Sequence, residues 1–223
     1  MISKPTLQIG SVSSTTEDNP HAMVRMVKHG NVDVLIGDWL SEMNIAWNAI
    51  IKQQNLDLGY ERGFLDQLEE SLDDIIAQGL KVITNAGALN TRSLARELGQ
   101  GRNGFSHLDH AEKQLDDWEL KPVCGAAYIR CRGIIQALNS GAQIVDDYDA
   151  LAGALIAGHL TECGPYVTGA NFTEFKEIMD DMIDLTFPIA EINSRGECVV
   201  TTLSDGGGRV TEDTVRAQIL YEL

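Results

Sequence analysis

The stretch that decides the fold comprises residues 60–90, which read YERGFLDQLEESLDDIIAQGLKVITNAGALN. In residues 60–78 the large apolar side chains fall on one stripe, which predicts an amphipathic helix, and Gly79 is the residue type that commonly ends one. Residues 81–84, KVIT, predict a β-strand, and a glycine-bearing polar turn at 85–90 leads into another helix. Helix, strand, turn and helix in succession are typical of βαβ units, in which the strands lie parallel.

The same alternation extends in both directions along the chain. Upstream, Asn19 and Pro20 begin a helix that Gly30 ends, and residues 32–36, VDVLI, predict a strand before a helix with apolar residues at helical spacing (Leu40, Met43, Ala46, Trp47 and Ile50). Downstream, we expect helices at 126–138, 148–162 and 211–221, a short strand at 142–145, and a β-rich segment at 188–192 and 198–203. Residues 99–121 are polar and we expect a mobile connection there.

We therefore expect an α/β fold with a mostly parallel, Rossmann-like sheet flanked by helices and a small β-rich segment near the C-terminus. At 223 residues, a single domain spanning 1–223 is the simplest organisation.

Composition excludes several classes of partner. The chain has 33 Asp and Glu against 17 Lys and Arg, a formal net charge of −16, which disfavours binding to nucleic acid or to an anionic membrane. The longest nearly apolar run, residues 150–160, is too short for a bilayer core that needs about 20 residues. With no secretory signal pattern and four widely spaced cysteines, we expect a soluble cytoplasmic protein with reduced thiols.

Asp38 and Glu42 follow the predicted strand at 32–36 and lie four residues apart, so they share one helix face. Ligands of open α/β sheets bind beyond the carboxyl ends of the strands, which places these carboxylates well for general acid–base catalysis or for binding Mg²⁺. The alternative is that both acids simply favour the positive end of a helix dipole.

Asn85, Gly87 and Asn90 occupy the equivalent position after the strand at 81–84. Gly87 permits close backbone approach, and the two amides can both donate and accept hydrogen bonds, which suits a polar substrate. The alternative is plain turn chemistry, because asparagine is itself a turn and cap residue.

His159, Glu162 and Cys163 cluster near the end of the predicted helix at 148–162. An imidazole beside a carboxylate can act as a tuned base, whereas the alternative is a histidine that satisfies the carboxyl end of the helix. Gly169 and Asn171 add a tight polar turn that can contribute to substrate binding.

No metal site or cofactor is specified by the sequence. His107 and His110 with Asp109 and Glu112 offer metal-type donors, but no closed ligand set is present and we expect a solvated helix face. The glycines at 206–208 can cradle an anion or form a flexible connection, and neither a dinucleotide fingerprint nor a Walker loop occurs. The cofactor is therefore left unassigned.

Several motifs together resemble the acyclic terpene utilisation (AtuA-like) family. They are VDVLIGDWLSE at 32–42, GLKVITNAGALN at 79–90, DALAGALIAGHLTECG at 149–164 with VTGANF at 167–172, and the segments 188–191 and 211–221. Members of this family are associated with the breakdown of acyclic terpenes through coenzyme A thioesters. The resemblance implies that Asp38, Glu42, Asn85, Asn90, His159, Glu162 and Asn171 line one site, without assigning their roles.

The chain also departs from the family pattern. Residues 10–18 differ from the family's first turn, and residues 99–121 are shorter and more polar than the corresponding segment. We also expect the C-terminal half of the usual domain to be missing. Two hypotheses follow. The first is a protein that binds a small polar or thioester metabolite, such as an acyl-CoA, with hydratase- or lyase-type chemistry if it is an enzyme. The second is a shortened, inactive relative with a binding or assembly role, whose exposed apolar edges predict a homo-oligomer.

Overall fold

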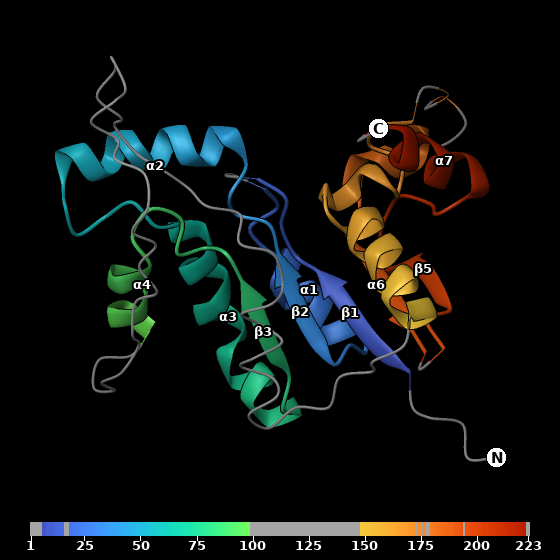
Figure 1. Ribbon diagram of the computed structural model, residues 1–223, viewed down its shortest axis with the longest axis horizontal. Helices are drawn as coiled ribbons and strands as arrows, with labels where there is room; N and C mark the ends of the chain where they lie inside the picture. Colours follow the sequence, from blue (N-terminus) through green and yellow to red (C-terminus); the bar gives the residue numbers. More distant parts are fainter. Residues whose placement is uncertain are drawn as a thin grey trace.

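A computed structural model describes residues 6–15, 18–98, 148–172, 174, 176, 179–193 and 195–221 (Figure 1). The elements in chain order are β1 (Leu7–Ser11), α1 (Ala22–His29), β2 (Val34–Gly37), α2 (Glu42–Gln54), α3 (Arg62–Gln78), β3 (Lys81–Thr84), α4 (Thr91–Leu98), α6 (Tyr148–Thr161), the 3₁₀ turns η2 (Gly164–Tyr166) and η4 (Met179–Asp184), β4 (Pro188–Ile192), β5 (Cys198–Thr202) and α7 (Glu212–Tyr221). The predictions for residues 99–147, including the mobile connection at 99–121, the helix at 126–138 and the strand at 142–145, lie outside the described residues.

The strands form one five-stranded sheet in the order β3-β2-β1-β4-β5. β1 pairs in parallel with β2, and β2 with β3, as the βαβ pattern predicted. β4 runs antiparallel to β1, and β5 antiparallel to β4. The expectation of a mostly parallel sheet is therefore wrong for the described part of the chain. The sheet is mixed, and its Rossmann-like character is not confirmed.

The connection between β4 and β5 explains one of the two antiparallel pairings. These two strands are joined by the short turn at residues 193–197, which produces an antiparallel pair because a parallel pair needs a long crossover. The β-rich C-terminal segment is thus not an appendage. It extends the same sheet beyond β1, which becomes the central strand of the sheet.

Helices cover the sheet in two groups. α1 and α3 pack against each other, whereas α6 packs on β4 and β5 and is itself contacted by α7 (Figure 1). α3 ends at Gly79, whose φ of 69° is the left-handed conformation expected of a glycine cap.

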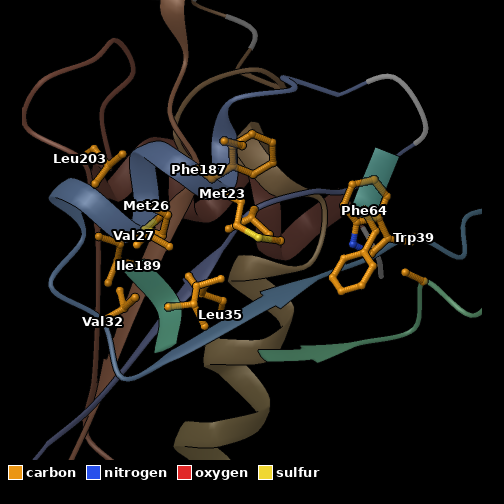
Figure 2. Close-up of a cluster of buried hydrophobic side chains, with 14 of the residues drawn as sticks. Met23, Met26, Val27, Val32, Leu35, Trp39, Phe64, Phe187, Ile189 and Leu203 are labelled. Atoms are coloured by element: carbon orange, nitrogen blue, oxygen red, sulfur yellow. The ribbon is translucent and has the colours of Figure 1, made fainter. Parts of the chain in front are cut away.

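One cluster of buried side chains joins the two ends of the described chain. Met23, Met26 and Leu35 from the N-terminal elements contribute to the same cluster as Phe187, Ile189 and Leu203 from the C-terminal part (Figure 2). Trp39, two residues after β2, belongs to the same cluster. Its ring packs edge-on against Phe64, with 6.1 Å between the ring centroids. The core therefore fixes the position of the turn that follows β2.

Candidate functional site

The carboxyl ends of β1, β2 and β3 meet at one edge of the sheet, and three turns follow them there. In the turn after β1, the Asp18 carboxylate accepts hydrogen bonds from the backbone N–H groups of Ser14 at 2.7 Å and Thr15 at 3.1 Å. Ser13 in turn accepts a hydrogen bond from the backbone N–H of Asp38 through its carbonyl oxygen, at 2.9 Å. The first two turns are thus joined directly.

Asp38 and Asn85, both predicted from the sequence, lie in contact. The Asn85 side chain donates through Nδ2 to Asp38 Oδ1 at 2.8 Å and accepts from the Trp39 backbone N–H at 2.7 Å. Asp38 Oδ1 also accepts from the Leu40 backbone N–H at 3.0 Å. The Asp38 carboxylate is therefore held in one orientation at the sheet edge while its side chain remains partly accessible.

Asn90 and Gly87 shape the turn before α4. Asn90 donates through Nδ2 to the carbonyl oxygens of Leu56 at 2.9 Å and Leu58 at 2.8 Å, while its Oδ1 faces the Ser93 N–H at 3.4 Å. A Cβ on Gly87 would lie 2.7 Å from Thr91 Oγ1, so the glycine is required by the tight start of α4. Both residues thus have a local structural task, and their role in substrate binding stays a prediction.

Glu42 is the first residue of α2 and is exposed in the first helical turn, where Ser41 caps the helix. No hydrogen bond among the described residues joins it to Asp38. Because α2 begins at Glu42, Asp38 lies in the turn before the helix, and the expectation that the two acids share one helix face is wrong.

His159 and Glu162 point to different surroundings near the end of α6. The half-buried His159 ring lies with Nε2 3.1 Å from the Gln218 backbone oxygen on α7, and Glu162 accepts a hydrogen bond from the Cys163 thiol at 2.7 Å. Gly164, with a φ of 53°, sits so close to the turn after β1 that a Cβ would lie 2.7 Å from Ser14 Oγ. The end of α6 thus reaches the sheet edge, whereas the His159 ring contacts α7.

Gly169 and Asn171 lie in the turn after η2. Gly169 is buried with a φ of 126°, a conformation that favours glycine, and Asn171 is exposed. The hydrogen bonds of Gly169 are local, since its N–H donates to the Tyr166 carbonyl oxygen at 3.0 Å. The role of these two residues in binding also remains a prediction.

A buried polar cluster that sequence reasoning missed lies beside these turns. Glu61 is 5% exposed, and its Oε1 accepts hydrogen bonds from the side-chain amides of Asn44, at 2.9 Å, and Asn48. Asn44 is 0% exposed and Asn48 2%, so α2 turns its polar side inward. The sequence signal for this cluster is a pair of asparagines four residues apart, followed by a glutamate at the start of the next helix.

The apolar side of α2 correspondingly faces out. Met43, Trp47 and Ile50 are 71%, 55% and 49% exposed. Trp47 therefore lies at the surface, whereas Trp39, at 1% exposed, lies in the core. A buried carboxylate requires donors, and α2 supplies them from Asn44 and Asn48.

The cluster borders a pocket of about 360 Å³ between α2 and the start of α3. Its walls combine aromatic and aliphatic side chains with carboxylates and amides, and they include Trp39, Trp47, Asn48, Ile51, Tyr60 and Glu61. Asp18, Arg62 and Asp66 also line it. The indole N–H of Trp39 has no hydrogen-bond partner among the described residues, and it lies over β2, where a Cβ on Gly37 would be 2.6 Å away. It therefore points at the strand.

The remaining candidates from the sequence are the glycine loop at 206–208 and the His and acidic residues at 107–112. The glycine loop at 206–208 is tied down, since the Gly207 N–H donates to Asp184 O at 2.7 Å and its carbonyl accepts from the Thr186 N–H at 3.0 Å. His107, Asp109, His110 and Glu112 lie outside the described residues. Within the described ranges, no group of three or more His, Cys, Asp or Glu side chains is placed to hold a metal ion. None of the helices described has the length and apolar character needed to cross a bilayer.

Comparison with known proteins gives one match. The sequence profile of the family described as "Acyclic terpene utilisation family protein AtuA" matches residues 7–101, 96–145 and 146–223 in three consecutive segments. No curated protein and no solved structure matches the chain.

Proposed function

The chain belongs to the acyclic terpene utilisation AtuA family, and from this premise we propose that it binds a small metabolite of acyclic terpene or related acyl-CoA catabolism. The observation that carries the proposal is the pocket of about 360 Å³ beside the carboxyl ends of the parallel strands. That volume lies in the range of about 300–1,000 Å³ typical of small-molecule sites, and the edge is where α/β sheets bind ligands.

The pocket combines the two kinds of wall that such a metabolite needs. Trp39, Trp47 and Ile51 offer an apolar surface for a hydrocarbon chain, while Asn48 and Glu61 offer polar groups that can orient its functional end. A branched acyclic chain buries its surface on the first set, and the buried cluster behind the second set fixes the direction of binding.

If the protein is an enzyme, we assign the acid–base role to Asp38. Its carboxylate is held by Asn85 and by the Leu40 N–H, and it lies next to the wall residue Trp39. Hydration, dehydration and acyl-type reactions all need a positioned proton acceptor of this kind. Glu42, the alternative acid–base residue, is exposed at the start of α2. We assign His159, whose Nε2 lies beside the Gln218 backbone oxygen, the role of a proton shuttle.

The test of binding is a thermal melt of the purified chain with a panel of acyclic alcohols, acids and acyl-CoA thioesters. A ligand present at about 100 times its Kd adds about 2.7 kcal/mol to the free energy of unfolding, which raises Tm by several degrees. A shift with any member supports a binding protein, and a cooperative melt that no member moves contradicts the proposal.

The catalytic assignment is tested separately once a ligand is found. Asp38→Asn keeps the size of the side chain and should abolish turnover while the ligand still shifts Tm. Glu42→Gln, a matched acid-to-amide change on the exposed start of α2, should leave turnover unchanged. Turnover that survives Asp38→Asn but is lost in His159→Ala would move the acid–base role to His159.

The alternative function is that of a non-catalytic assembly protein, and the exposed apolar side of α2 supports it. The stripe of Met43, Trp47 and Ile50 on α2 is exposed, and contiguous exposed apolar side chains often mark protein interfaces. Sedimentation of the wild-type chain and of a Met43→Ser/Ile50→Ser variant tests this alternative. An oligomer that the double variant dissociates supports it, and a monomeric wild type excludes it.

A further inference from the structure

Resting on the proposed function, we propose that the pocket between α2 and α3 takes a ligand whose polar end donates hydrogen bonds and carries no negative charge. The ligand class is an aliphatic alcohol or amine, and the pocket excludes the matched carboxylate and the coenzyme A thioester.

The walls of the pocket include one side-chain acceptor, on Asn48, that the described hydrogen bonds leave available. Asn48 uses both hydrogens of its side-chain amide, donating to the Asn44 carbonyl oxygen at 2.9 Å and to Glu61 Oε1. Its own Oδ1 has no hydrogen-bond partner among the described residues, although the residue is only 2% exposed and lines the pocket. An acceptor on a side chain that lines the pocket can receive a hydrogen bond from the O–H or N–H group of a ligand.

The charges around the pocket agree with this assignment. Asp18, Glu61 and Asp66 line it against one cation, Arg62, which is exposed. The whole chain carries a formal net charge of −16. A carboxylate or the phosphates of coenzyme A would therefore meet both like charge and acceptor groups, whereas an ammonium gains from both features and a hydroxyl from the acceptors alone.

The size of the pocket also favours a small alcohol or amine as the ligand. About 360 Å³ is at the lower end of the range for small-molecule sites. Trp47 and Ile51 offer apolar surface for a short hydrocarbon chain, so the pocket suits a compact ligand with one polar end better than a nucleotide-bearing thioester.

The experiment compares four ligands with the same six-carbon chain by titration calorimetry of the full chain at neutral pH. They are hexan-1-amine, hexan-1-ol, hexanoate and hexanoyl-CoA. We expect hexan-1-amine to bind most tightly, hexan-1-ol next, and hexanoate about tenfold or more weaker than the amine. Binding of hexanoate or hexanoyl-CoA that equals or exceeds binding of both donors overturns the inference and leaves the proposed function standing. No binding by any of the four overturns both.

Two charge-reversal variants then test whether the preference for amine over carboxylate arises at this pocket. Asp66→Lys changes an exposed pocket residue on α3, and Asp73→Lys makes the same change on the same helix outside the pocket. We expect Asp66→Lys to reduce the preference for amine over carboxylate by about tenfold, and Asp73→Lys to leave it unchanged. An identical preference in both variants would contradict binding at this pocket.

Discussion

Glu61 is the single residue on which the polar side of the pocket depends, because its buried carboxylate accepts from two buried amides. Asn44 and Asn48 reach it from α2, and its own backbone N–H donates to the Ala86 carbonyl oxygen at 2.9 Å. It thus connects α2, α3 and the turn after β3. Buried donors that lose their acceptor cost more than an ordinary hydrogen bond contributes, since they are no longer solvated by water.

We predict that Glu61→Ala lowers the free energy of unfolding by about 2–4 kcal/mol, because two buried amides each lose a hydrogen bond to the Glu61 carboxylate. Glu61→Gln keeps an acceptor oxygen and should cost about 1 kcal/mol. The measurement is urea denaturation of each variant. Glu69→Ala, on the exposed part of α3, is the control and should change stability by less than about 0.5 kcal/mol. Equal stability of Glu61→Ala and Glu69→Ala would contradict the prediction.

Among the helices, α3 and α6 show that the same substitution can act in opposite directions. Gly79 ends α3 with a φ of 69° and has nothing within 4 Å of where a Cβ would lie. Gly158 lies inside α6, and a Cβ there would also meet nothing within 4 Å. Packing is therefore equal at the two sites, and only the backbone conformation differs.

We predict that Gly79→Ala destabilises the protein by about 1 kcal/mol and that Gly158→Ala stabilises it by about 0.5–1 kcal/mol. The first forces an L-residue into the left-handed region, whereas the second removes the entropy cost of a glycine in a helix interior. Paired thermal melts measure both changes. Shifts of the same sign in the two variants would show that packing, and not φ, governs these sites.

The hairpin of β4 and β5 contains the two clear pKa shifts of the described residues. The pKa of Glu197 lies below its usual value because its carboxylate accepts hydrogen bonds from Asn193 and Arg195. Burial raises the pKa of the Cys198 thiol on β5, which keeps it neutral. The folded turn thus stabilises the ionised form of Glu197.

We predict that Glu197 contributes to the acid sensitivity of the protein. A folded-state pKa below the unfolded one gives stability that is present above the unfolded pKa and is lost as pH falls through the folded pKa. Glu197→Gln should therefore have a lower Tm than the wild type near neutral pH, and the two should converge as the pH falls through the lowered folded-state pKa of Glu197. Glu212→Gln, at the exposed start of α7, is the control for a general charge effect. A Tm difference that stays constant with pH would contradict the prediction.

For the molecule as a whole, the excess of acids governs the response to salt. A formal net charge of −16 means that repulsion opposes the compact state. Some acids are paired, as in the contact of Arg25 Nη1 with Asp184 Oδ1 at 2.8 Å, but 33 acids face only 17 bases. Screening should therefore remove more repulsion than attraction.

We predict that raising sodium chloride from about 20 to about 300 mM increases Tm by roughly 2–4 °C, which corresponds to about 1 kcal/mol for a chain of this size. Potassium chloride at the same ionic strength should give the same shift, which distinguishes screening from binding of one ion. A fall in Tm would show that ion pairs such as Arg25–Asp184 outweigh the general repulsion.

The strand and turn residues that the sequence located best are those with strong local signals. Residues 81–84 form β3 as predicted, and α3 ends before Gly79 because glycine adopts the left-handed φ of this position most readily. The contact of Asp38 with Asn85 was foreseeable, because consecutive parallel strands end at one edge. β1 was not predicted from its own residues, since LQIGS at 7–11 is short and ends in small residues, although it is the central strand.

By itself, the sequence determined the helix–strand alternation, the turns at the sheet edge and the family to which the chain belongs. Only the tertiary structure decided that β4 and β5 run antiparallel to β1, and that α2 buries Asn44 and Asn48 in place of Met43 and Trp47. Local periodicity sets the type of an element, but strand direction depends on pairing between distant segments. The inward face of α2 depends likewise on Glu61, since a buried carboxylate is stable only where amide donors surround it.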